Sequence, residues 1–452
     1  MDVQSDAHDW NARPVIGFFA AFLLLTSGLA MGATKCVNPG GTGGCYPSIN
    51  AAVAAASPND TIRVAPGTYH ENVVVTKPLS LVGAGAGRSI IDATGLANGI
   101  DVDGHHHPGL SHVVVTGFSV RNANLQGILI TDSSFVSIFD NHITGNDKSL
   151  NPGPPPTCPG LPPYFQAGEG FDCGEGMHLS GVTHSTIASN LVDHNAGGIL
   201  LSDDTGVTSD NLISGNVVKN NPFDCGITLA SHHFWLPGMP TSPAWGVFHN
   251  TITANIAAYN GLSTGEGAGV GIFSGPPGAK DYANVVIGNE LFGNALPGVT
   301  MHSHSPFQSL NDNLITGNRI AGNGADGDVP GSGTSGILIF SDTSGGAPPI
   351  TGTVISQNII RDEEVDITVA TDGAVDAHLN SLLGRSVGVQ NMGVGSVDAR
   401  ENWWGCKEGP SAKGCSHIVG PNVAFEPWLT RPFVDDKSED DDKKFDDDRH
   451  KD

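Results

Sequence analysis

Residues 190–201 read Asn-Leu-Val-Asp-His-Asn-Ala-Gly-Gly-Ile-Leu-Leu, and variants of this stretch return down most of the chain. The first half places two Asn five positions apart, and the second half reads Gly-φ-x-φ, where φ is apolar. The Asn pair recurs at Asn141 and Asn146, Asn216 and Asn221, Asn255 and Asn260, Asn289 and Asn294, and Asn318 and Asn323. The second element recurs at Gly127–Ile130, Gly176–Leu179, Gly226–Leu229, Gly269–Ile272, Gly298–Met301 and Gly336–Ile339.

The alternation within each copy predicts short β-strands, because apolar residues at every second position give a strand one buried face. The shortest interval, from Gly176 to Gly198, is 22 positions. A period in the twenties is typical of stacked coils, whereas propeller blades need roughly 40 residues. An Asn at one recurring position can hydrogen-bond to its counterpart in the next coil. The sequence therefore predicts an all-β parallel β-helix, a solenoid of stacked coils.

Both ends of the predicted solenoid have features of caps. Residues 47–56 predict a short amphipathic helix over the first coil, and the aromatic residues of 402–405 and 427–429 predict an aromatic cap over the last. Residues 1–33 contain an apolar run followed by small residues, which predicts a signal peptide, with an uncleaved N-terminal anchor as the alternative. The β-helix domain is expected over residues 36–433, and the highly charged residues 434–452 are expected to be a disordered tail.

Cysteine usage and charge restrict the compartment and the partners. Three disulfides across short loops are predicted: Cys36–Cys45, Cys158–Cys173 and Cys406–Cys415. Cys225 belongs to none of these pairs, and we expect it to be buried as a small hydrophobic residue. Together with the signal peptide they predict a secreted, periplasmic or cell-surface protein. The formal net charge of −25 argues against nucleic acid, whose phosphates would be repelled. A neutral glycan or a divalent cation remains compatible with it, and we expect a monomer.

Several segments resemble a known superfamily. Residues 62–74 (Ile-Arg-Val-Ala-Pro-Gly-Thr-Tyr-His-Glu-Asn-Val-Val), 79–85 (Leu-Ser-Leu-Val-Gly-Ala-Gly) and 90–92 (Ile-Ile-Asp) resemble the opening coils of the pectin-lyase-like superfamily. The Asn-rich coils and the Asn402-Trp-Trp-Gly405 ending resemble its carbohydrate-binding and sugar-hydrolase branch, which includes NosD-type periplasmic proteins. The resemblance covers roughly residues 36–430. It implies a right-handed parallel β-helix that handles carbohydrate outside the cytoplasm.

The sequence departs from the individual enzyme families of that superfamily. The Gln-Asp and Asp-Phe-Ile-Phe-Gly segments of pectin methylesterases are missing, as are the Gly-His-Gly and Arg-Ile-Lys motifs of polygalacturonases and the Asp-Pro-His-Asp motif of alginate epimerases. Since one fold hosts many functions, the resemblance specifies the fold and no particular enzyme.

The repeat register gathers polar residues on one side of the solenoid. In Gly-φ-x-φ the φ residues point inward, so the x residue and those just after the strand are expected to face outward. The outward strip defined in this way contains Asp132, His178, Asp203, Asp204, His232, His233, His302, His304 and Asp342. Coils about 4.8 Å apart would place Asp203 and Asp204 beside His232 and His233.

Two kinds of chemistry suit that strip. Asp203, Asp204 and His232 are the predicted catalytic residues, because paired carboxylates can act as general acid and base on a glycosidic bond. The residues predicted to bind substrate are His178, His233, Trp235, His302 and His304, with the Trp235 ring stacked on a sugar. The alternative is that these Asp and His residues cap turns, and that Trp235 only packs its loop.

Three insertions, at residues 148–175, 234–246 and 262–268, are expected to build a groove over the strip; the last of them carries Glu266. No cofactor is specified. The strip would suit Ca²⁺ if oxygen ligands dominate, or Cu²⁺ or Zn²⁺ if imidazoles do. The triplet His105, His106 and His107 could also bind a metal, with a solvated loop as the alternative.

The hypothesis is therefore an exported protein with polysaccharide as its partner, which hydrolyses the polysaccharide in a glycosidase-like reaction. The first alternative is a non-catalytic protein that binds glycan or metal, and the second is a structural stalk. A lyase is disfavoured because the strip offers no obvious Arg or Lys as a base.

Overall fold

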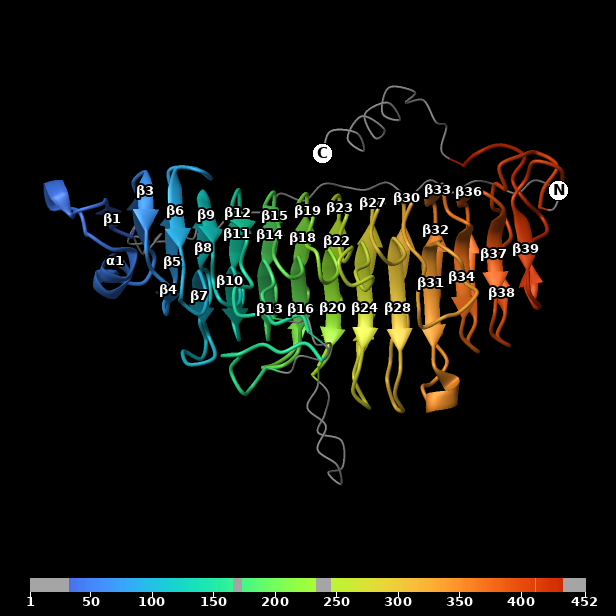
Figure 1. Cartoon of the computed structure of the whole chain (residues 1–452), viewed down its shortest axis with the longest axis horizontal. Helices are drawn as coiled ribbons and strands as arrows, with labels where there is room; N and C mark the ends of the chain where they lie inside the picture. The colour runs from blue at the N-terminus through green and yellow to red at the C-terminus, as the bar shows by residue number, and fades with distance from the viewer. Residues whose placement is uncertain (1–31, 154, 166–172, 233–244, 411, 434–452) are drawn as a thin grey trace, which may run out of the picture. The chain divides into compact units, whose positions relative to one another are not determined.

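The computed structural model describes residues 32–153, 155–165, 173–232, 245–410 and 412–433. The predicted signal segment, apart from its last two residues, and the predicted tail lie outside the described residues. Within the described part, short strands line up in three long parallel sheets that run the length of the molecule (Figure 1). Successive strands of the chain pass from one sheet to the next, so each turn of the chain adds a strand to each sheet. The predicted parallel β-helix is confirmed.

The strands of the three long sheets, here named A, B and C, follow in stacking order. Sheet A contains β1 (Thr34–Val37), β2 (Asp60–Val64), β5 (Leu79–Val82), β8 (Val114–Thr116), β11 (Ser137–Phe139), β14 (Thr186–Ala188), β18 (Leu212–Ser214), β22 (Thr251–Thr253), β26 (Val285–Ile287), β29 (Leu314–Thr316), β32 (Thr353–Ser356), β35 (Val375–His378), β38 (Val397–Asp398) and β40 (Val423–Ala424). Sheet B contains β3 (Gly67–Tyr69), β6 (Ser89–Asp92), β9 (Phe118–Arg121), β12 (His142–Thr144), β15 (Leu191–Asp193), β19 (Val217–Lys219), β23 (Ile256–Ala258), β27 (Glu290–Phe292), β30 (Arg319–Ala321), β33 (Ile359–Arg361) and β36 (Ser381–Leu383).

Sheet C contains β4 (Val73–Val75), β7 (Ile100–Asp103), β10 (Ile128–Thr131), β13 (Met177–Ser180), β16 (Ile199–Ser202), β20 (Ile227–Ser231), β24 (Val270–Ser274), β28 (Val299–Ser303), β31 (Ser335–Ser341), β34 (Val365–Ala370), β37 (Val387–Asn391) and β39 (His417–Val419). A small fourth sheet contains β17 (Thr208–Ser209), β21 (Val247–Phe248) and β25 (Asp281–Tyr282). The described part also contains helix α1 (Ile49–Ala55) and the 3₁₀ turns η1 (Thr42–Gly44) and η2 (Thr343–Gly345).

The interior of the coils is one continuous apolar core. The inward position after each Gly of sheet C stacks Ile128 on Met177, Ile199, Ile227, Val270, Val299 and Ile337 in successive strands, all of them buried. Each such side chain contributes about 1.5–3 kcal/mol relative to exposure. The Gly-φ-x-φ pattern therefore marks where the chain passes through sheet C.

Ladders of buried Asn run along the stack, as the sequence predicts. One joins Asn141, Asn190, Asn216, Asn255, Asn289, Asn318, Asn358, Asn380 and Asn402, each side-chain amide donating to the next oxygen at 2.9–3.1 Å. A second runs from Asn146 through Asn195, Asn221, Asn260, Asn294 and Asn323 to Glu363. A third, which the sequence pattern did not predict, joins Asn211, Asn250, Asn284 and Asn313.

Both predicted caps are present. Helix α1 contacts β1, β2 and β4, and the side chain of Ser48 accepts a hydrogen bond from the backbone N–H of Ala51 at its N-terminus. At the other end Trp404 is fully buried in the core cluster, and Trp428 packs against it.

The three predicted disulfides form, between Cys36 and Cys45, Cys158 and Cys173, and Cys406 and Cys415. Cys225 is buried, as expected, and its Sγ accepts a hydrogen bond from the N–H of Ala268 at 3.2 Å. Within the described ranges, no helix has the length and apolar character needed to span a bilayer.

Candidate functional site

The outer face of sheet C carries the predicted polar strip, but most of the strip is covered. Strand register places His178 in one outward column with Leu129, Leu200 and Leu338, and these four side chains are at most 3% exposed. The Phe165 ring, from the insertion after β12, packs 4.9 Å from the His178 ring. The expectation of an open position was therefore wrong at His178, because Phe165 packs over its ring.

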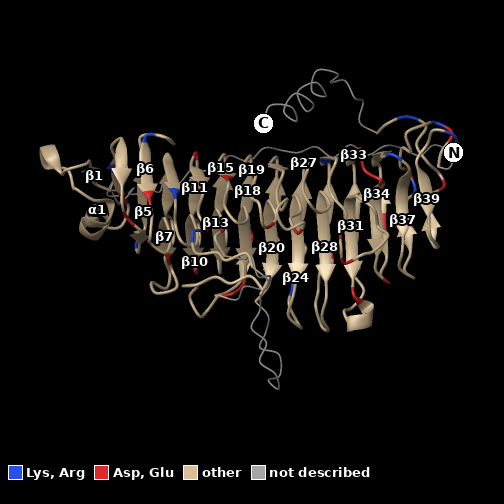
Figure 2. Cartoon of the chain, in the orientation of Figure 1, with Lys and Arg blue, Asp and Glu red and all other residues tan. Residues whose placement is uncertain are grey.

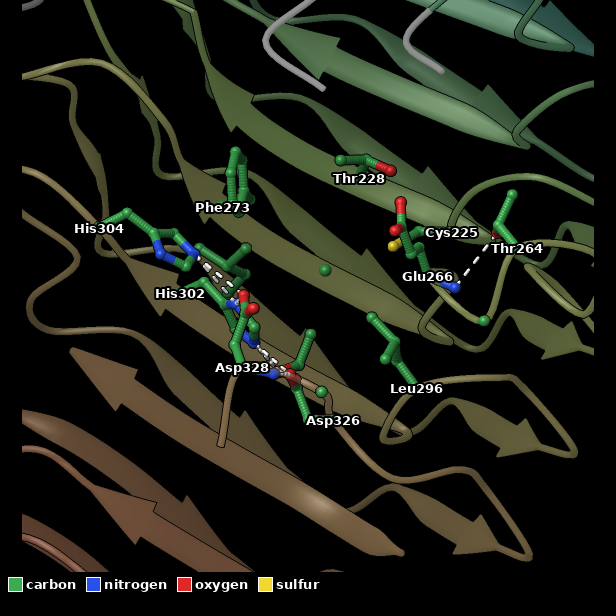
Figure 3. Close-up of a pocket in the computed structure, with 15 residues that line it drawn as sticks. Cys225, Thr228, Thr264, Glu266, Phe273, Leu296, His302, His304, Asp326 and Asp328 are labelled. Carbon is green, nitrogen blue, oxygen red and sulfur yellow. Dashed lines mark hydrogen bonds and ion pairs between the residues drawn. The ribbon is translucent and has the colours of Figure 1, made fainter. Parts of the chain in front are cut away.

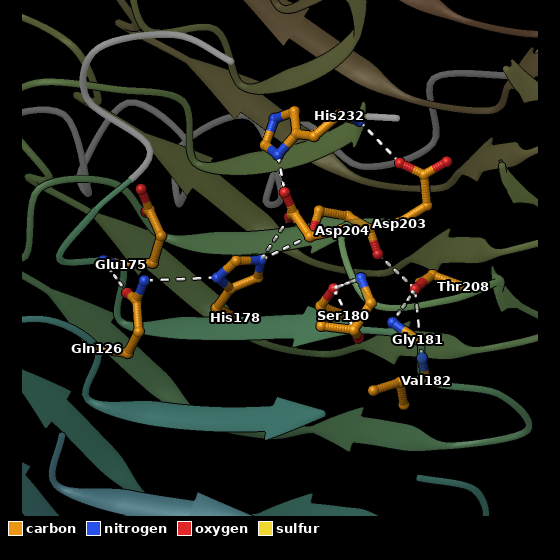
Figure 4. A network of polar contacts seen from close by, with 12 residues as sticks. Gln126, Glu175, His178, Ser180, Gly181, Val182, Asp203, Asp204, Thr208 and His232 are labelled. Carbon is orange, nitrogen blue, oxygen red and sulfur yellow. Dashed lines mark hydrogen bonds and ion pairs between the residues drawn. The ribbon is translucent and has the colours of Figure 1, made fainter. Parts of the chain in front are cut away.

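His178, Asp204 and His232 form a buried polar network (Figure 4). Nδ1 of His232 lies 3.2 Å from Oδ2 of Asp204, and Nε2 of His178 lies 3.8 Å from the same oxygen. Nε2 of His178 also lies 2.7 Å from the hydroxyl of Ser202. Burial raises the pKa of Asp204, but the two imidazoles and Ser202 outweigh it and lower that pKa. The stacking of coils does bring these residues together, as the repeat register predicts.

Asp203 points away from this network and accepts hydrogen bonds from the backbone at His232 and Gly246. Its carboxylate accepts hydrogen bonds from the N–H of His232 at 2.8 Å, the N–H of Gly246 at 2.7 Å and the hydroxyl of Ser231 at 2.9 Å. Burial raises the pKa of Asp203. The adjacent Asp281 is fully buried, its pKa is also raised by burial, and its Oδ2 accepts a hydrogen bond from the N–H of Ser231 at 3.2 Å. Asp203 thus has the turn-capping contacts of the alternative interpretation.

The side chains of Asp204 and His232 are 0% exposed, so the predicted catalytic residues have no described path to solvent. Their catalytic role stays a prediction. His233 and Trp235, both predicted to bind substrate, lie outside the described residues.

A pocket of about 550 Å³ opens on the same face of sheet C, at β20, β24 and β28 (Figure 3). Its floor includes Thr228, Gly271, Phe273, Thr300 and His302, which the register places in two adjacent outward columns. Gly271 has no side chain, and a Cβ added there would lie 3.0 Å from Sγ of Cys225, so this part of the floor has no room for a larger residue beside Cys225.

The two predicted histidines, His302 and His304, stand together at one side of the pocket. Nδ1 of His302 lies 3.2 Å from Nε2 of His304, and 3.4 Å from Oδ2 of Asp328. Nε2 of His304 lies 3.6 Å from the same Asp328 oxygen. The side chain of His302 is 7% exposed, that of His304 is 27% exposed and that of Asp328 is 56% exposed, so the group opens into the pocket.

Asp326 fixes this group from behind. Its Oδ2 lies 2.7 Å from Nε2 of His302, and its Oδ1 accepts a hydrogen bond from the backbone N–H of Asp328 at 3.0 Å. Burial lowers the pKa of His302, but the hydrogen bonds to Asp326 and Asp328 outweigh it and raise that pKa to about 9. Burial and then the charge of His302 lower the pKa of His304.

The turn that carries His304 is held by Gln308. The Gln308 side-chain oxygen accepts from the N–H of His304 at 2.7 Å and from the N–H of Ser305 at 2.9 Å, and its amide donates to the carbonyl of Ser274 at 2.6 Å. Gln308 is 4% exposed. The side chain of a buried residue therefore sets the position of His304.

Across the pocket, Glu266 and Cys225 face the histidine side (Figure 3). Phe273 lies on the histidine side, with its ring 5.3 Å from that of His304. Among the residues that the structure describes, the lining contains three carboxylates, of Glu266, Asp326 and Asp328, and no Lys or Arg. Basic side chains are sparse over the described sheets as a whole (Figure 2).

Sequence reasoning found His302, His304 and the insertion with Glu266, but missed Asp326, Asp328 and Phe273. Asp326 and Asp328 lie in a Gly-rich insertion between Asn323 and Gly336, whose length interrupts the repeat and could have marked it. Elsewhere in the strip, Asp132 lies 2.8 Å from His105, and Asp342 caps η2. His106 and His107 pair with Asp103 on an exposed turn, as the alternative for that triplet expects.

Comparison with known proteins supports the fold. The family model described as "Right handed beta helix region" matches residues 93–307. No curated protein sequence matches the chain. The A-module of a mannuronan C-5 epimerase from Azotobacter vinelandii is 15% identical, with a TM-score of 0.54, and the match covers 85% of this chain and 94% of that one. DFA-IIIase from Arthrobacter chlorophenolicus A6, solved without its lid, is 12% identical with a TM-score of 0.52, over 88% of this chain and 99% of that one.

Proposed function

Since the chain is a right-handed parallel β-helix with the pectin-lyase-like fold, we propose that it is an exported protein that binds a neutral polysaccharide at the Glu266–Phe273 pocket and hydrolyses it there. Three disulfides support export, because such bonds persist in oxidising compartments. The structural similarity to the mannuronan epimerase supports polysaccharide in general as the substrate, and the choice of a neutral one rests on the pocket alone.

One observation carries the proposal: a pocket of about 550 Å³ combines a carboxylate, an aromatic ring and a hydrogen-bonding histidine group on the outer face of sheet C. That volume lies within the range of about 300–1,000 Å³ found for small-molecule sites. A chain of sugars could cross such a pocket along the stack, because the sheet continues on both sides of β24.

The charge of the pocket selects the substrate. Its described lining contains Glu266, Asp326 and Asp328 and neither Lys nor Arg. The carboxylates of a polyuronate would meet like charges there, which disfavours binding. A neutral glycan needs only hydrogen-bond partners and an apolar surface, and Phe273 is partly exposed and offers that surface.

The roles follow from position. We assign Glu266 as the general acid: it would donate its proton to the glycosidic oxygen as the bond from that oxygen to the anomeric carbon breaks. Water would add its oxygen to the anomeric carbon, and the proton that it releases would pass to the carboxylate of Asp328 across the pocket. Asp203 is not part of this assignment, because its oxygens already accept three hydrogen bonds, from the Ser231 hydroxyl and from the N–H groups of His232 and Gly246.

The test is incubation of the full chain with a panel of neutral glucans, fructans and mannans beside polyuronates. Release of reducing ends would report hydrolysis, and unsaturated ends would report elimination. We expect reducing ends from a neutral polysaccharide, and a loss of about 100-fold or more in the rate with Glu266→Gln. Glu290→Gln, the same change on sheet B, is the matched control and should keep full activity.

Binding without cleavage by the wild type would support the binding-protein alternative and overturn the hydrolytic step. Neither binding nor cleavage of any neutral polysaccharide would overturn the proposed function as a whole.

A further inference from the structure

The donor atoms of His302, His304 and Asp328 form a nearly equilateral triangle. Its sides are 3.2 Å between the two ring nitrogens, and 3.4 and 3.6 Å from these nitrogens to Oδ2 of Asp328. A tetrahedral Zn²⁺ with bonds of about 2.0–2.2 Å places its ligand atoms about 3.3–3.6 Å apart. The triangle therefore has the size of one face of such a coordination sphere.

The position of Asp326 behind His302 also indicates a metal site. It is 5% exposed as a residue, and its Oδ2 lies 2.7 Å from Nε2 of His302, which leaves Nδ1 directed at His304 and Asp328. A carboxylate behind the far nitrogen of a ligating histidine is the usual outer support of a metal site. The same Asp326 also holds the backbone of Asp328 through its other oxygen. One buried side chain thus positions two of the three donors.

The surroundings also suit an open site. His302 stands in its outward column between Phe273 of β24 and Phe340 of β31, and the Phe340 ring lies 5.6 Å from each histidine ring. The aromatic rings restrict the histidines from both sides, while the pocket leaves room for a fourth ligand. Three protein ligands with one open position are typical of catalytic zinc sites.

We propose that His302 Nδ1, His304 Nε2 and Asp328 Oδ2 bind one divalent transition-metal ion, of the Zn²⁺ class, at the side of the pocket. Two imidazoles and one carboxylate suit Zn²⁺ or a similar ion, whereas Ca²⁺ takes six to eight oxygen ligands. The proposal does not depend on polysaccharide being the substrate, since it concerns only what these three side chains bind.

The test is titration of the full, chelator-dialysed protein with ZnCl₂ by calorimetry, followed by dialysis and elemental analysis. Co²⁺ added instead of Zn²⁺ should give the intense visible bands of a four-coordinate site. We expect one tightly bound equivalent in the wild type. His304→Gln should lose that equivalent, Asp328→Asn should weaken it at least tenfold, and Asp326→Asn should weaken it about 10–100-fold by releasing His302.

Two control variants address the other histidine groups. His106→Ala alters the exposed triplet, and His378→Ala alters the group of Asp376, His378 and Asp398, whose donor atoms also lie close together. Both variants should retain the tight equivalent and the Co²⁺ bands. Wild-type protein without a tight equivalent would overturn the proposal. So would a tight equivalent that survives in His304→Gln and Asp328→Asn, each shown to be folded by its thermal transition. Glycan binding by Phe273→Ala tests the proposed function separately, because Phe273 is not a metal ligand.

Discussion

Oδ2 of Asp326 lies 2.7 Å from Nε2 of His302, and this contact turns the opposite nitrogen of the ring towards the pocket. The two residues come from different parts of one coil: His302 lies on β28, and Asp326 lies in the insertion after β30. The solenoid supplies a fixed strand, and the insertion supplies the partner that orients its side chain. The same division explains the pocket as a whole, with a floor from sheet C and walls from the segments between coils.

The first prediction concerns the Asn ladders. In Asn255→Ala, the backbone N–H and the amide of Asn216 lose the oxygen to which both donate, while Asn289 loses an amide donor. Because these groups are buried, we expect a loss of about 2–4 kcal/mol in the free energy of unfolding, measured by urea denaturation. Asn151→Ala, at an exposed position, should change it by less than about 0.5 kcal/mol. Equal effects of the two changes would show that the ladder adds no stability.

The second prediction concerns Glu363, where a carboxyl replaces the last Asn of the second ladder. Burial raises the pKa of Glu363 to about 7, from 4.5 for the free side chain. The protonated form is therefore favoured in the folded state, and its stabilising contribution is present below pH 4.5 and lost as the pH rises through 7. Glu363→Gln removes this loss while keeping the oxygen that accepts from Asn323. At pH 8 the variant should be more stable than the wild type by about 2–3 kcal/mol.

At pH 4 the same variant and the wild type should have nearly equal stability, as followed by denaturation across the pH range. Glu401→Gln, at an exposed position, is the control and should leave the pH profile unchanged. A constant difference between Glu363→Gln and the wild type at all pH values would contradict the explanation.

A third prediction addresses the carboxylates that the sequence singled out. Asp203→Asn should destabilise the protein by about 1–3 kcal/mol, because the amide replaces an oxygen that now accepts from loop N–H groups. Cleavage of a neutral polysaccharide by the folded Asp203→Asn and Asp204→Asn variants should stay within a few-fold of the wild type. A loss of cleavage rate comparable to that of Glu266→Gln would indicate that the buried carboxylates Asp203 and Asp204 are catalytic instead.

The fourth prediction tests how the turn with His304 is held. Gln308→Leu leaves the N–H groups of His304 and Ser305 without their acceptor, and these groups are partly buried. We expect about 2–3 kcal/mol less stability and a Zn²⁺ affinity at least fivefold weaker. Gln308→Asn keeps the amide on a shorter side chain and should fall between Gln308→Leu and the wild type. Unchanged Zn²⁺ affinity in a destabilised Gln308→Leu would mean that the turn keeps its geometry without Gln308.

The fold could be predicted from the sequence because each repeat contains the same two signals at the same spacing. An Asn that must pair along the stack and a Gly before an inward apolar residue fix where each coil turns and where it passes through sheet C. Stacking by register also brought Asp204 to His232, although these residues are 28 positions apart. That inference needed only the repeat length.

The pocket could not be predicted in the same way, because burial on the outer face depends on segments that do not repeat. His178 and His302 look alike in the pattern, yet Phe165 packs on the first while the second opens into a pocket. Asp326 and Asp328 reach His302 through an insertion whose path no periodicity specifies. The repeat therefore determines which residues share an outward column of sheet C. The insertions determine which residues of each column are exposed to solvent.

If the Glu266–Phe273 pocket holds the glycan, changes to its lining must alter binding or cleavage. The most direct measurement is the affinity of the folded Phe273→Ala and Glu266→Gln proteins for the neutral polysaccharide that the wild type recognises, together with the reducing ends that each releases. We predict that Phe273→Ala weakens binding about tenfold, since the ring supplies about 1.4 kcal/mol of sugar contact. Glu266→Gln should bind nearly as the wild type does but release reducing ends about 100-fold more slowly, or slower still. Unchanged affinity in Phe273→Ala together with full cleavage by Glu266→Gln would contradict the account.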